Sequence, residues 1–568
     1  MRDSRTVVVA IVLGASLAVT SGLSAQTDRQ NGRRADPMTA SIKGIVTAAD
    51  TGGALRGAEV RLSSRGSYSR LVTTDHDGSF TLSDLPAGDY RLTVSRVGFT
   101  PLVFGQRRPL EAPKTIALSE GQTFTTNLAL TRGGVIHGRV LDSFGEPIAG
   151  TRVQVLRSRM VRGQRRLQSM GPGDQTDDTG GFRIYGLPPG DYYVSASAGP
   201  ADSAKRDPPI YYPGTPSYAE AQTISVPAGA EASADFQLVP LRTARVSGVV
   251  FNASGAPVQA MVQLASEAVG MGPVLENGGP PPAFTLNADA GPDGTFTIDN
   301  VPPGPYQLTA NSSFTAGVLT GNAAADAAPG RNRAMEAIMA RGPETASMAL
   351  IVSGDDVSGL ALTTRRGGVL KGAFVAAPGV VQPLPQGLQV SIRSLSAGGA
   401  SMMQGGARGE FQVAGMSGPF YLEVQGIPDG WAISQVVVDG ADMTDEPIDV
   451  RGGTAAARIV MTDRLTTISG TVQSRNGVSS HSVVVFPDDE ARWAYPSRYV
   501  RAVRADDRGR FRIPGLPPNA RYFVAAVDYL EDGDEQDPKF LDRLRARAMT
   551  ISLGDGEQRS VVLDPITP

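Results

Sequence analysis

The sequence predicts an all-β protein, a tandem array of about five β-sandwich domains. One phrase recurs along the chain, runs of alternating apolar and polar residues flank each copy, and turn-forming residues are abundant, with 67 glycines and 41 prolines among 568 residues. Alternation with a period of two is typical of half-buried strands, and Gly and Pro mark the turns between them. A chain of this length exceeds what one hydrophobic core supports, so several domains are expected.

The N-terminus has the composition of a secretory signal peptide. Arg2 and Arg5 form a short basic region, residues 7–19 are apolar, and small residues lead up to Ala25. Cleavage after Ala25 is therefore expected, and an uncleaved membrane anchor is the alternative. Residues 26–39 are polar and are expected to form a flexible leader. This N-terminus predicts export, with the periplasm, the cell surface and the external medium as the three destinations.

The recurring phrase begins with a turn and a strand. Asp77 and Gly78 form a hairpin-turn dipeptide, because Gly accepts a positive φ and Asp tolerates it. Phe80 and Leu82 then face one side of a strand, and Thr81 faces the other. The phrase returns at residues 181–192, 294–306 and 509–519, and in a degenerate form at 409–420.

The second half of the phrase predicts a corner. Pro86 has a restricted φ and keeps the preceding Leu85 extended, so we expect this corner to carry the chain from one sheet to the other. In the strand that follows, Tyr90, Leu92 and Val94 are expected to point inward.

Each copy opens with a strand that contains a central glycine and closes with a strand that leads directly into the next copy. The short linkers predict a semi-rigid string of domains. The expected organisation is a signal peptide at 1–25, a leader at 26–39, and sandwiches at 40–132, 133–241, 242–364 (with insertions), 365–463 (degenerate) and 464–568 (with a short helix).

Two helices are expected within the insertions. One lies at residues 333–340 of the third copy. The other begins in the fifth copy, with Asp537 as the N-cap and Pro538 in the first turn. Its apolar stripe is formed by Phe540, Leu541, Leu544 and Ala548.

Together, the G-x-V opening, the Asp-Gly turn and the phrase G-x-F-x-[LI]-x-x-L-P-P-G-x-Y resemble the carboxypeptidase regulatory-like domain. The resemblance implies a transthyretin-like, or prealbumin-like, sandwich with a carbohydrate-binding-like fold, and it covers nearly all of the chain after the leader. It is specific for the fold and says little about function, because such domains accompany peptidases, surface proteins, transport receptors and polysaccharide-binding proteins.

The residues argue against an enzyme. Cysteine is absent, and none of the three histidines (His76, His137 and His481) has the Glu three residues later that the zinc carboxypeptidase motif requires. Neither a G-x-S-x-G elbow nor a phosphate-binding loop is present. We therefore predict no catalytic residue, no cofactor and no metal. Asp-rich turns could bind calcium, but Asp-Gly hairpins account for them without a metal.

Two clusters of aromatic residues that we expect to be exposed are the best candidates for a binding site. Flat rings on a sandwich edge can stack on sugar faces, and loops on rigid sheets often carry binding residues. The alternative is that these rings hold long loops against their own domain. The candidates are Trp493, Tyr495 and Tyr499 in the fifth copy, and Tyr211, Tyr212 and Tyr218 in the second.

The sequence favours a secreted or cell-surface, non-enzymatic protein that acts as a binding or spacer module, with a polysaccharide or an envelope protein as its partner. The alternatives are an accessory or adhesion rod of an outer-membrane transport or surface system and a peptidase-associated regulatory protein. A formal net charge of −3 with scattered basic residues argues against nucleic acid as a partner. No transmembrane span is expected after the signal peptide.

Overall fold

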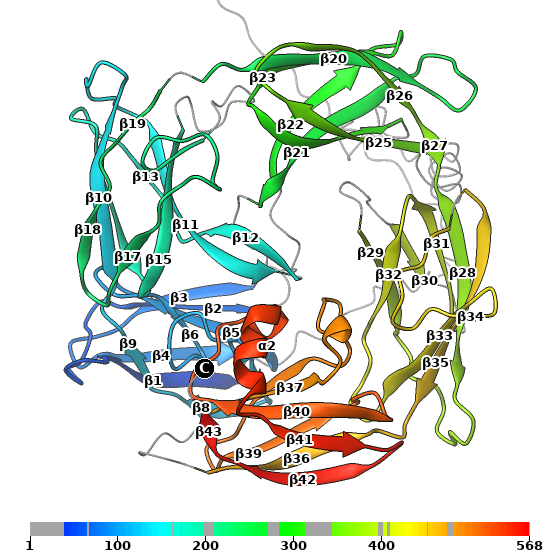
Figure 1. Cartoon of the computed structure of the whole chain (residues 1–568). Helices are drawn as coiled ribbons and strands as arrows, with labels where there is room; N and C mark the ends of the chain where they lie inside the picture. Colours follow the sequence, from blue (N-terminus) through cyan, green and yellow to red (C-terminus); the bar gives the residue numbers. More distant parts are fainter. Residues whose placement is uncertain are drawn as a thin grey trace, which may run out of the picture.

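In the computed structural model, the chain is described from residue 39 to residue 566, with internal gaps (Figure 1). The described ranges are 39–64, 68–161, 163–171, 173–197, 209–239, 241–270, 283–312, 344–395, 402–405, 409–450, 452–473 and 481–566. The expected signal peptide, the leader up to residue 38 and the helix expected at 333–340 lie outside these ranges. Within them the chain folds into five β-sandwiches, each made of two sheets, as the repeats predict.

The first sandwich shows the topology on which the others are built. In one sheet, β1 (Ala40–Ala48) pairs antiparallel with β4 (Ser79–Leu85) and parallel with β8 (Thr123–Thr125) and β9 (Leu128–Leu130). The second sheet has the order β3 (Ser69–Thr73), β2 (Glu59–Ser64), β5 (Gly88–Ser95), β6 (Leu102–Val103), with β7 (Ile116–Leu118) also on β5. The chain therefore changes sheets between β4 and β5, which confirms the predicted corner.

The second and third sandwiches repeat this plan. In the second, one sheet consists of β14 (Gly181–Leu187), β10 (Gly134–Leu141), β18 (Glu231–Ser233) and β19 (Phe236–Gln237). The other sheet consists of β12 (Gln164–Ser169), β11 (Arg152–Val161), β15 (Gly190–Ser197), β16 (Ile210–Tyr211), β13 (Asp174–Gln175) and β17 (Ile224–Val226). In the third, one sheet consists of β23 (Thr295–Val301), β20 (Ala244–Phe251) and β26 (Val357–Thr363). The other sheet consists of β22 (Ala283–Ala290), β21 (Ala260–Gly270), β24 (Gly304–Asn311), β25 (Glu344–Val352) and β27 (Arg365–Arg366).

The fourth sandwich departs from the plan, and the fifth returns to it. The fourth has one sheet of β30 (Met402–Gly405), β31 (Glu410–Met416), β28 (Gly368–Ala376), β35 (Thr454–Thr462), β33 (Ala432–Val438) and β34 (Ala441–Asp442), and a second of β29 (Gln389–Ser394) and β32 (Phe420–Gln425). In the fifth, one sheet consists of β39 (Arg510–Pro514), β36 (Thr467–Val472) and β42 (Gln558–Leu563). The other sheet consists of β38 (Arg501–Arg504), β37 (Ser482–Pro487), β40 (Ala520–Val527), β41 (Met549–Leu553) and β43 (Pro565–Ile566).

The helix expected in the fifth copy is present as α2 (Pro538–Arg545). The Asp537 side chain accepts a hydrogen bond from the backbone N–H of Lys539, which is the predicted N-cap. Phe540, Leu541 and Leu544 are buried, as the apolar stripe predicts. Two short 3₁₀ helices, η2 (Glu490–Arg492) and η3 (Asp534–Gln536), belong to the same domain.

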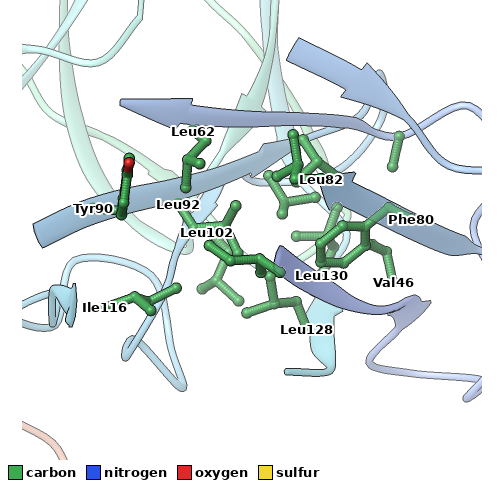
Figure 2. Packing of buried hydrophobic residues seen from close by; sticks show 14 of the residues in the cluster. Val46, Leu62, Phe80, Leu82, Tyr90, Leu92, Leu102, Ile116, Leu128 and Leu130 are labelled. Carbon is green, nitrogen blue, oxygen red and sulfur yellow. The ribbon is translucent and has the colours of Figure 1, made fainter. Parts of the chain in front are cut away.

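The core of the first sandwich follows the predicted alternation. Phe80 and Leu82 of β4 are buried, as are Tyr90, Leu92 and Val94 of β5. Figure 2 shows Leu82 and Leu92 gathered with other apolar side chains between the strands. The alternation therefore defines the core positions, because each strand turns every second side chain inward.

The tyrosine of the phrase closes the corner with a hydrogen bond. The Tyr90 hydroxyl donates to the carbonyl oxygen of Pro86 at 2.8 Å, and the Tyr522 hydroxyl donates to that of Pro517 at 2.7 Å. Tyr192 and Tyr306 donate in the same way to Pro188 and Pro302. The bond gives both the hydroxyl and the carbonyl a partner inside the corner, which accounts for the tyrosine in these four copies. The degenerate fourth copy has Phe420 there and lacks this bond.

In all five copies, the residue that precedes the apolar residue of the corner (Leu85 in the first copy) adopts a left-handed backbone conformation. Its φ is 55° at Asp84, 77° at Gly186, 59° at Asn300, 80° at Gly415 and 73° at Gly515. Gly, Asn and Asp are the residues that reach this region at least cost. In the first sandwich, the register of β1 against β4 shifts opposite this residue, between Ala40 and Ile42. The residue thus forms a bulge where the sheet turns toward the corner.

The central glycine of each opening strand lies where two backbones approach closely. A Cβ on Gly372 would lie 2.6 Å from the carbonyl oxygen of Ala457 and would also overlap the Phe411 ring. A Cβ on Gly44 would overlap the carbonyl of Thr126, and one on Gly470 would overlap that of Val561. The G-x-V motif is therefore a packing requirement between the opening and closing strands.

We expect Gly372→Ala to destabilise the fourth sandwich by about 3 kcal/mol, because neither the Ala457 carbonyl nor the Phe411 ring has room to move. Gly453→Ala is the matched control in the same domain, since a Cβ there meets nothing within 4 Å. Hydrogen exchange of β28 and β35 in denaturant measures the effect. Equal exchange in the two variants would contradict this account.

The five consecutive sandwiches form a closed ring (Figure 1), a closure that the predicted semi-rigid string of domains did not specify. Figure 1 shows the C-terminal sandwich beside the first one, with α2 next to the strands of the first two domains. The fifth domain also contacts the fourth, where Arg498 pairs with Asp445 at 2.7 Å. Short linkers are compatible with either shape. The contacts that close the ring join residues hundreds of positions apart, so no local pattern indicates them.

An almost buried ion pair joins the last domain to the first. Arg504 of β38 donates to the Glu111 carboxylate at 2.7 Å and also to the carbonyl oxygen of Gly105. The side chains are 13% and 6% exposed. Glu111 also accepts from the backbone N–H of Arg107 at 2.8 Å. Nearby, the Tyr529 hydroxyl donates to the carbonyl of Pro109 at 2.8 Å. These bonds compensate the desolvation of both charges, which is the condition for a buried pair to be tolerated.

The fifth domain meets the second through further arginines. Arg157 donates to the Glu531 carboxylate at 2.5 Å, and Arg165 donates to Asp537 at 2.6 Å. The Arg159 guanidinium donates to the carbonyl of Asp532 at 2.6 Å. The second domain thus presents cations from β11 and β12 to an acidic segment, residues 531–537, of the fifth.

We expect Arg504→Ala to open the junction between the first and fifth domains, because it leaves the buried Glu111 without its cation, at a cost of about 3–5 kcal/mol. Hydrogen exchange of residues 104–115 should accelerate, and the radius of gyration measured by small-angle X-ray scattering should increase. Arg521→Ala is the control, since its pair with Asp488 is exposed and lies within the fifth domain. Unchanged exchange in Arg504→Ala would argue against this role.

Candidate functional site

A pocket of about 290 Å³ lies in the fifth domain, under the loop that precedes β38. It is formed by this loop, by β38 itself and by η3. Its lining residues are Trp493, Tyr495, Ser497, Val500, Arg501, Ala502, Glu535 and Gln536. Two of the predicted aromatic residues, Trp493 and Tyr495, are therefore brought together in one concave site.

The loop from 488 to 500 is held in place by its own contacts. Asp489 caps η2 by accepting from the backbone N–H of Ala491 at 3.1 Å. The Trp493 ring packs edge-on against Phe486, with 5.5 Å between ring centroids, and its indole N–H donates to the carbonyl of Pro487 at 2.7 Å. This tryptophan therefore both lines the pocket and anchors the loop.

The expectation that the aromatic residues of this loop are exposed is wrong for two of the three. Trp493 is 3% exposed and Tyr499 is 6% exposed. The Tyr499 hydroxyl donates to Asp445 of the fourth domain at 3.0 Å, and its ring stacks on Tyr522. Tyr495 is half-buried. The alternative, in which the rings hold the loop against the protein, therefore describes Trp493 and Tyr499.

The second predicted group lies elsewhere and is also packed. Tyr211 is 3% exposed and lies against Leu156 and Leu167, together with the half-buried Tyr218. Tyr212 packs edge-on against Phe236, with 6.1 Å between centroids. These three rings support the second sandwich, and none of them lines the pocket.

Tyr495 lies where three domains meet. The Arg393 guanidinium of the fourth domain lies over its ring, 4.2 Å from the centroid. On the second domain, a Cβ on Gly163 would come within 2.5 Å of the Tyr495 Cβ, and Gly163 donates its backbone N–H to the Gln536 side chain at 3.0 Å. Glycine thus lets the β11–β12 turn approach the loop closely, and ring closure positions the wall of the pocket.

Burial sets the electrostatics of the site. Burial, with the neighbouring Glu531 charge as the next cause, raises the pKa of Asp534 to about 6. Burial also raises the pKa of Glu535, although its carboxylate accepts from the backbone N–H of Gly533 at 3.1 Å. For Arg501, burial lowers the pKa of the guanidinium. The pocket therefore combines a partly desolvated cation, Arg501, with an acid, Glu535, whose pKa is raised by burial.

Sequence reasoning did not single out Ser497, Arg501, Glu535 or Gln536. Their segments, 488–501 and 531–537, are extra to the repeat in the fifth copy. The difference between copies was thus the available signal for the location. No signal in the sequence marked the individual side chains, because their burial depends on how both insertions fold.

The Asp-rich turns use their carboxylates within the turn itself. Asp506 accepts from the backbone N–H groups of Arg510 and Arg508 at 2.8 and 3.0 Å, and these bonds and the Arg510 side chain lower its pKa. Asp177 accepts from Thr179 and Gly181 in the same way. In the part of the chain that the structure describes, no group of three or more potential metal ligands is found. No helix there is long and apolar enough to cross a membrane.

The fold defines a multidomain β-sandwich protein, and the pocket described above is built on insertions of its fifth domain. Residues 41–131 and 135–239 each match the family model of the carboxypeptidase regulatory-like domain. The first two sandwiches are therefore carboxypeptidase regulatory-like domains, as the resemblance implied.

Among solved structures, the chain is similar to the Bacillus anthracis TIE protein, with 14% identity, 57% of this chain and 50% of that chain covered, and a TM-score of 0.15. This chain thus spans half the length of that protein. It is also similar to a streptococcal ancillary pilin (12% identity, 57% and 98% covered, TM-score 0.20) and to BcpA, the major pilin subunit of Bacillus cereus (10%, 57% and 99%, 0.13). TM-scores this low carry no information about function. No curated protein matches the sequence.

We expect Asp534→Asn to stabilise the protein at pH 8 by on the order of 1 kcal/mol, allowing for partial exposure of the group. The pKa of Asp534 is raised in the folded state, so ionisation costs stability as pH rises from about 4, the unfolded value, through about 6. Glu531 and Glu535 add to this cost, and Arg159 reduces it. The Asn oxygen can still accept from the Glu531 N–H.

Chemical unfolding monitored between pH 4 and pH 8 measures this effect. The wild-type protein should lose stability across the window relative to Asp534→Asn. Asp507→Asn, an exposed residue of the same domain, is the control. A variant that is less stable than wild type at pH 8 would contradict the assignment.

Proposed function

We propose that the protein is an exported, non-enzymatic binding protein, and that its ligand is a small carbohydrate or the end of a polysaccharide held in the pocket of the fifth domain. The observation that carries the proposal is the convergence of aromatic and polar side chains in this pocket, where the second, fourth and fifth domains meet. Clefts between domains are preferred locations for ligand sites. The signal-like N-terminus supports export.

The lining suits a sugar. Tyr495 and the edge of Trp493 offer apolar surface, while Ser497, Glu535 and Gln536 offer hydroxyl, carboxyl and amide groups. A sugar ring presents apolar C–H faces and a rim of hydroxyl groups, so both kinds of surface are used. The volume is at the lower end of the range for ligand pockets, which favours a ligand of monosaccharide size.

A spacer or adhesion rod finds no support in the shape of the molecule. Such a role needs an extended chain, whereas the ring brings the last domain back to the first. An envelope protein as the partner would need a surface of its own, and the small pocket does not supply one.

A glycan array probed with the full chain tests the proposal, and we expect at least one class of saccharide to be retained. Tyr495→Ala should weaken this binding roughly tenfold, since it removes a wall of the pocket. Tyr185→Ala is the matched control, because Tyr185 is 55% exposed and lies on β14, away from the pocket. Retention of no saccharide, or equal loss in both variants, would argue against the proposal.

A further inference from the structure

Arg501 is half-buried, and its guanidinium is a partly desolvated positive charge without a carboxylate partner. Its Nη1 donates to the carbonyl oxygens of Ser497 and Val500, both at 3.0 Å. Among the described residues, no carboxylate lies within ion-pair distance of this guanidinium, and Nη1 alone makes hydrogen bonds to them. A cation that is partly withdrawn from water without a carboxylate partner favours the arrival of an anion.

Other arginines of the same region differ from Arg501. Arg498 pairs with Asp445, Arg504 pairs with Glu111 and Arg492 pairs with Asp489. The positive charge of Arg498 also lies close enough to lower the pKa of Arg501 further, after the larger effect of burial. Every neighbouring guanidinium thus has its carboxylate, and Arg501 alone of these four faces the pocket without one.

The acid of the pocket does not supply the missing charge. Both Glu535 oxygens are engaged elsewhere, one accepting from the Gly533 N–H at 3.1 Å and the other from the Gln536 side-chain amide at 3.2 Å. Burial favours the neutral form of this carboxyl. The pocket therefore supplies no carboxylate that pairs with Arg501.

We propose that the ligand of this pocket is an acidic saccharide, one whose carboxylate pairs with Arg501. This inference rests on the proposed function and names the ligand class of the same site. A guanidinium offers a planar fork of N–H donors that matches a carboxylate. One cation balances one negative charge, which favours a carboxylate over a doubly charged phosphate ester. Ser497 and Gln536 then face the sugar hydroxyls, and Tyr495 faces the ring.

Calorimetric titration of the full chain tests this inference with four probes. The probes are galacturonic acid, its methyl ester, galactose, and galactose 6-phosphate. The methyl ester has the same ring and size as the acid but no charge, so it tests the ion pair without any change to the protein. We expect galacturonic acid to bind at least about tenfold more tightly than the ester, galactose or the phosphate.

Two variants locate the effect. Arg501→Gln should remove the preference for the acid over its ester, and Arg501→Lys should restore part of it, because the charge remains while the fork is lost. Arg512→Gln is the matched control, since Arg512 is an exposed cation on β39 of the same domain. It should leave the preference unchanged.

The outcomes separate the inference from the proposed function. Equal binding of the acid, the ester and galactose by the wild-type protein would overturn the role of Arg501 and leave a neutral-sugar site in place. Tighter binding of the phosphate would overturn the choice of a carboxylate. If none of these probes binds and a full glycan array retains nothing, the proposed function fails, and the inference fails with it.

Discussion

The ion pair between Arg504 and Glu111 joins two domains across 393 positions of sequence, and the shape of the molecule depends on it. Each charge is withdrawn from water, so neither is stable without the other. Their contact brings the fifth domain against the first. The arginines of the second domain that pair with residues 531–537 hold the fifth domain in the same position. The β11–β12 turn of the second domain reaches Tyr495 across the same junction, so closure of the ring completes the surroundings of the pocket, whose lining residues all belong to the fifth domain.

The fold inside each domain could be predicted from the sequence because its causes are local. The alternation in β4 and β5, the corner at Pro86 and the cap of α2 involve residues only a few positions apart. The same applies to the bond from Tyr90 to Pro86, although the phrase alone does not reveal which carbonyl the hydroxyl meets. The ring could not be predicted, since its contacts depend on the surfaces that complete domains present to one another.

The site was predicted in part. The aromatic loop is the right region, and Tyr495 lines the pocket, but Trp493 and Tyr499 serve mainly to hold that loop. Polar neighbours in the sequence suggested exposure, whereas the packing partners Phe486 and Asp445 decide burial. Arg501 occupies an ordinary position in an alternating strand. What sets Arg501 apart is that no carboxylate of the described residues lies within ion-pair distance of its guanidinium. No sequence pattern shows this.

A closed ring also limits how the protein can evolve. In open arrays of repeats each unit contacts only its neighbours, so units are gained and lost with little effect on the others. Here the last unit must reach the first, and a duplicated or deleted sandwich would move Arg504 away from Glu111. The divergence of the fourth copy is tolerated because its two sheets still fill the same arc. The closure of this ring therefore depends on the number of repeats as well as on the surface that each one presents.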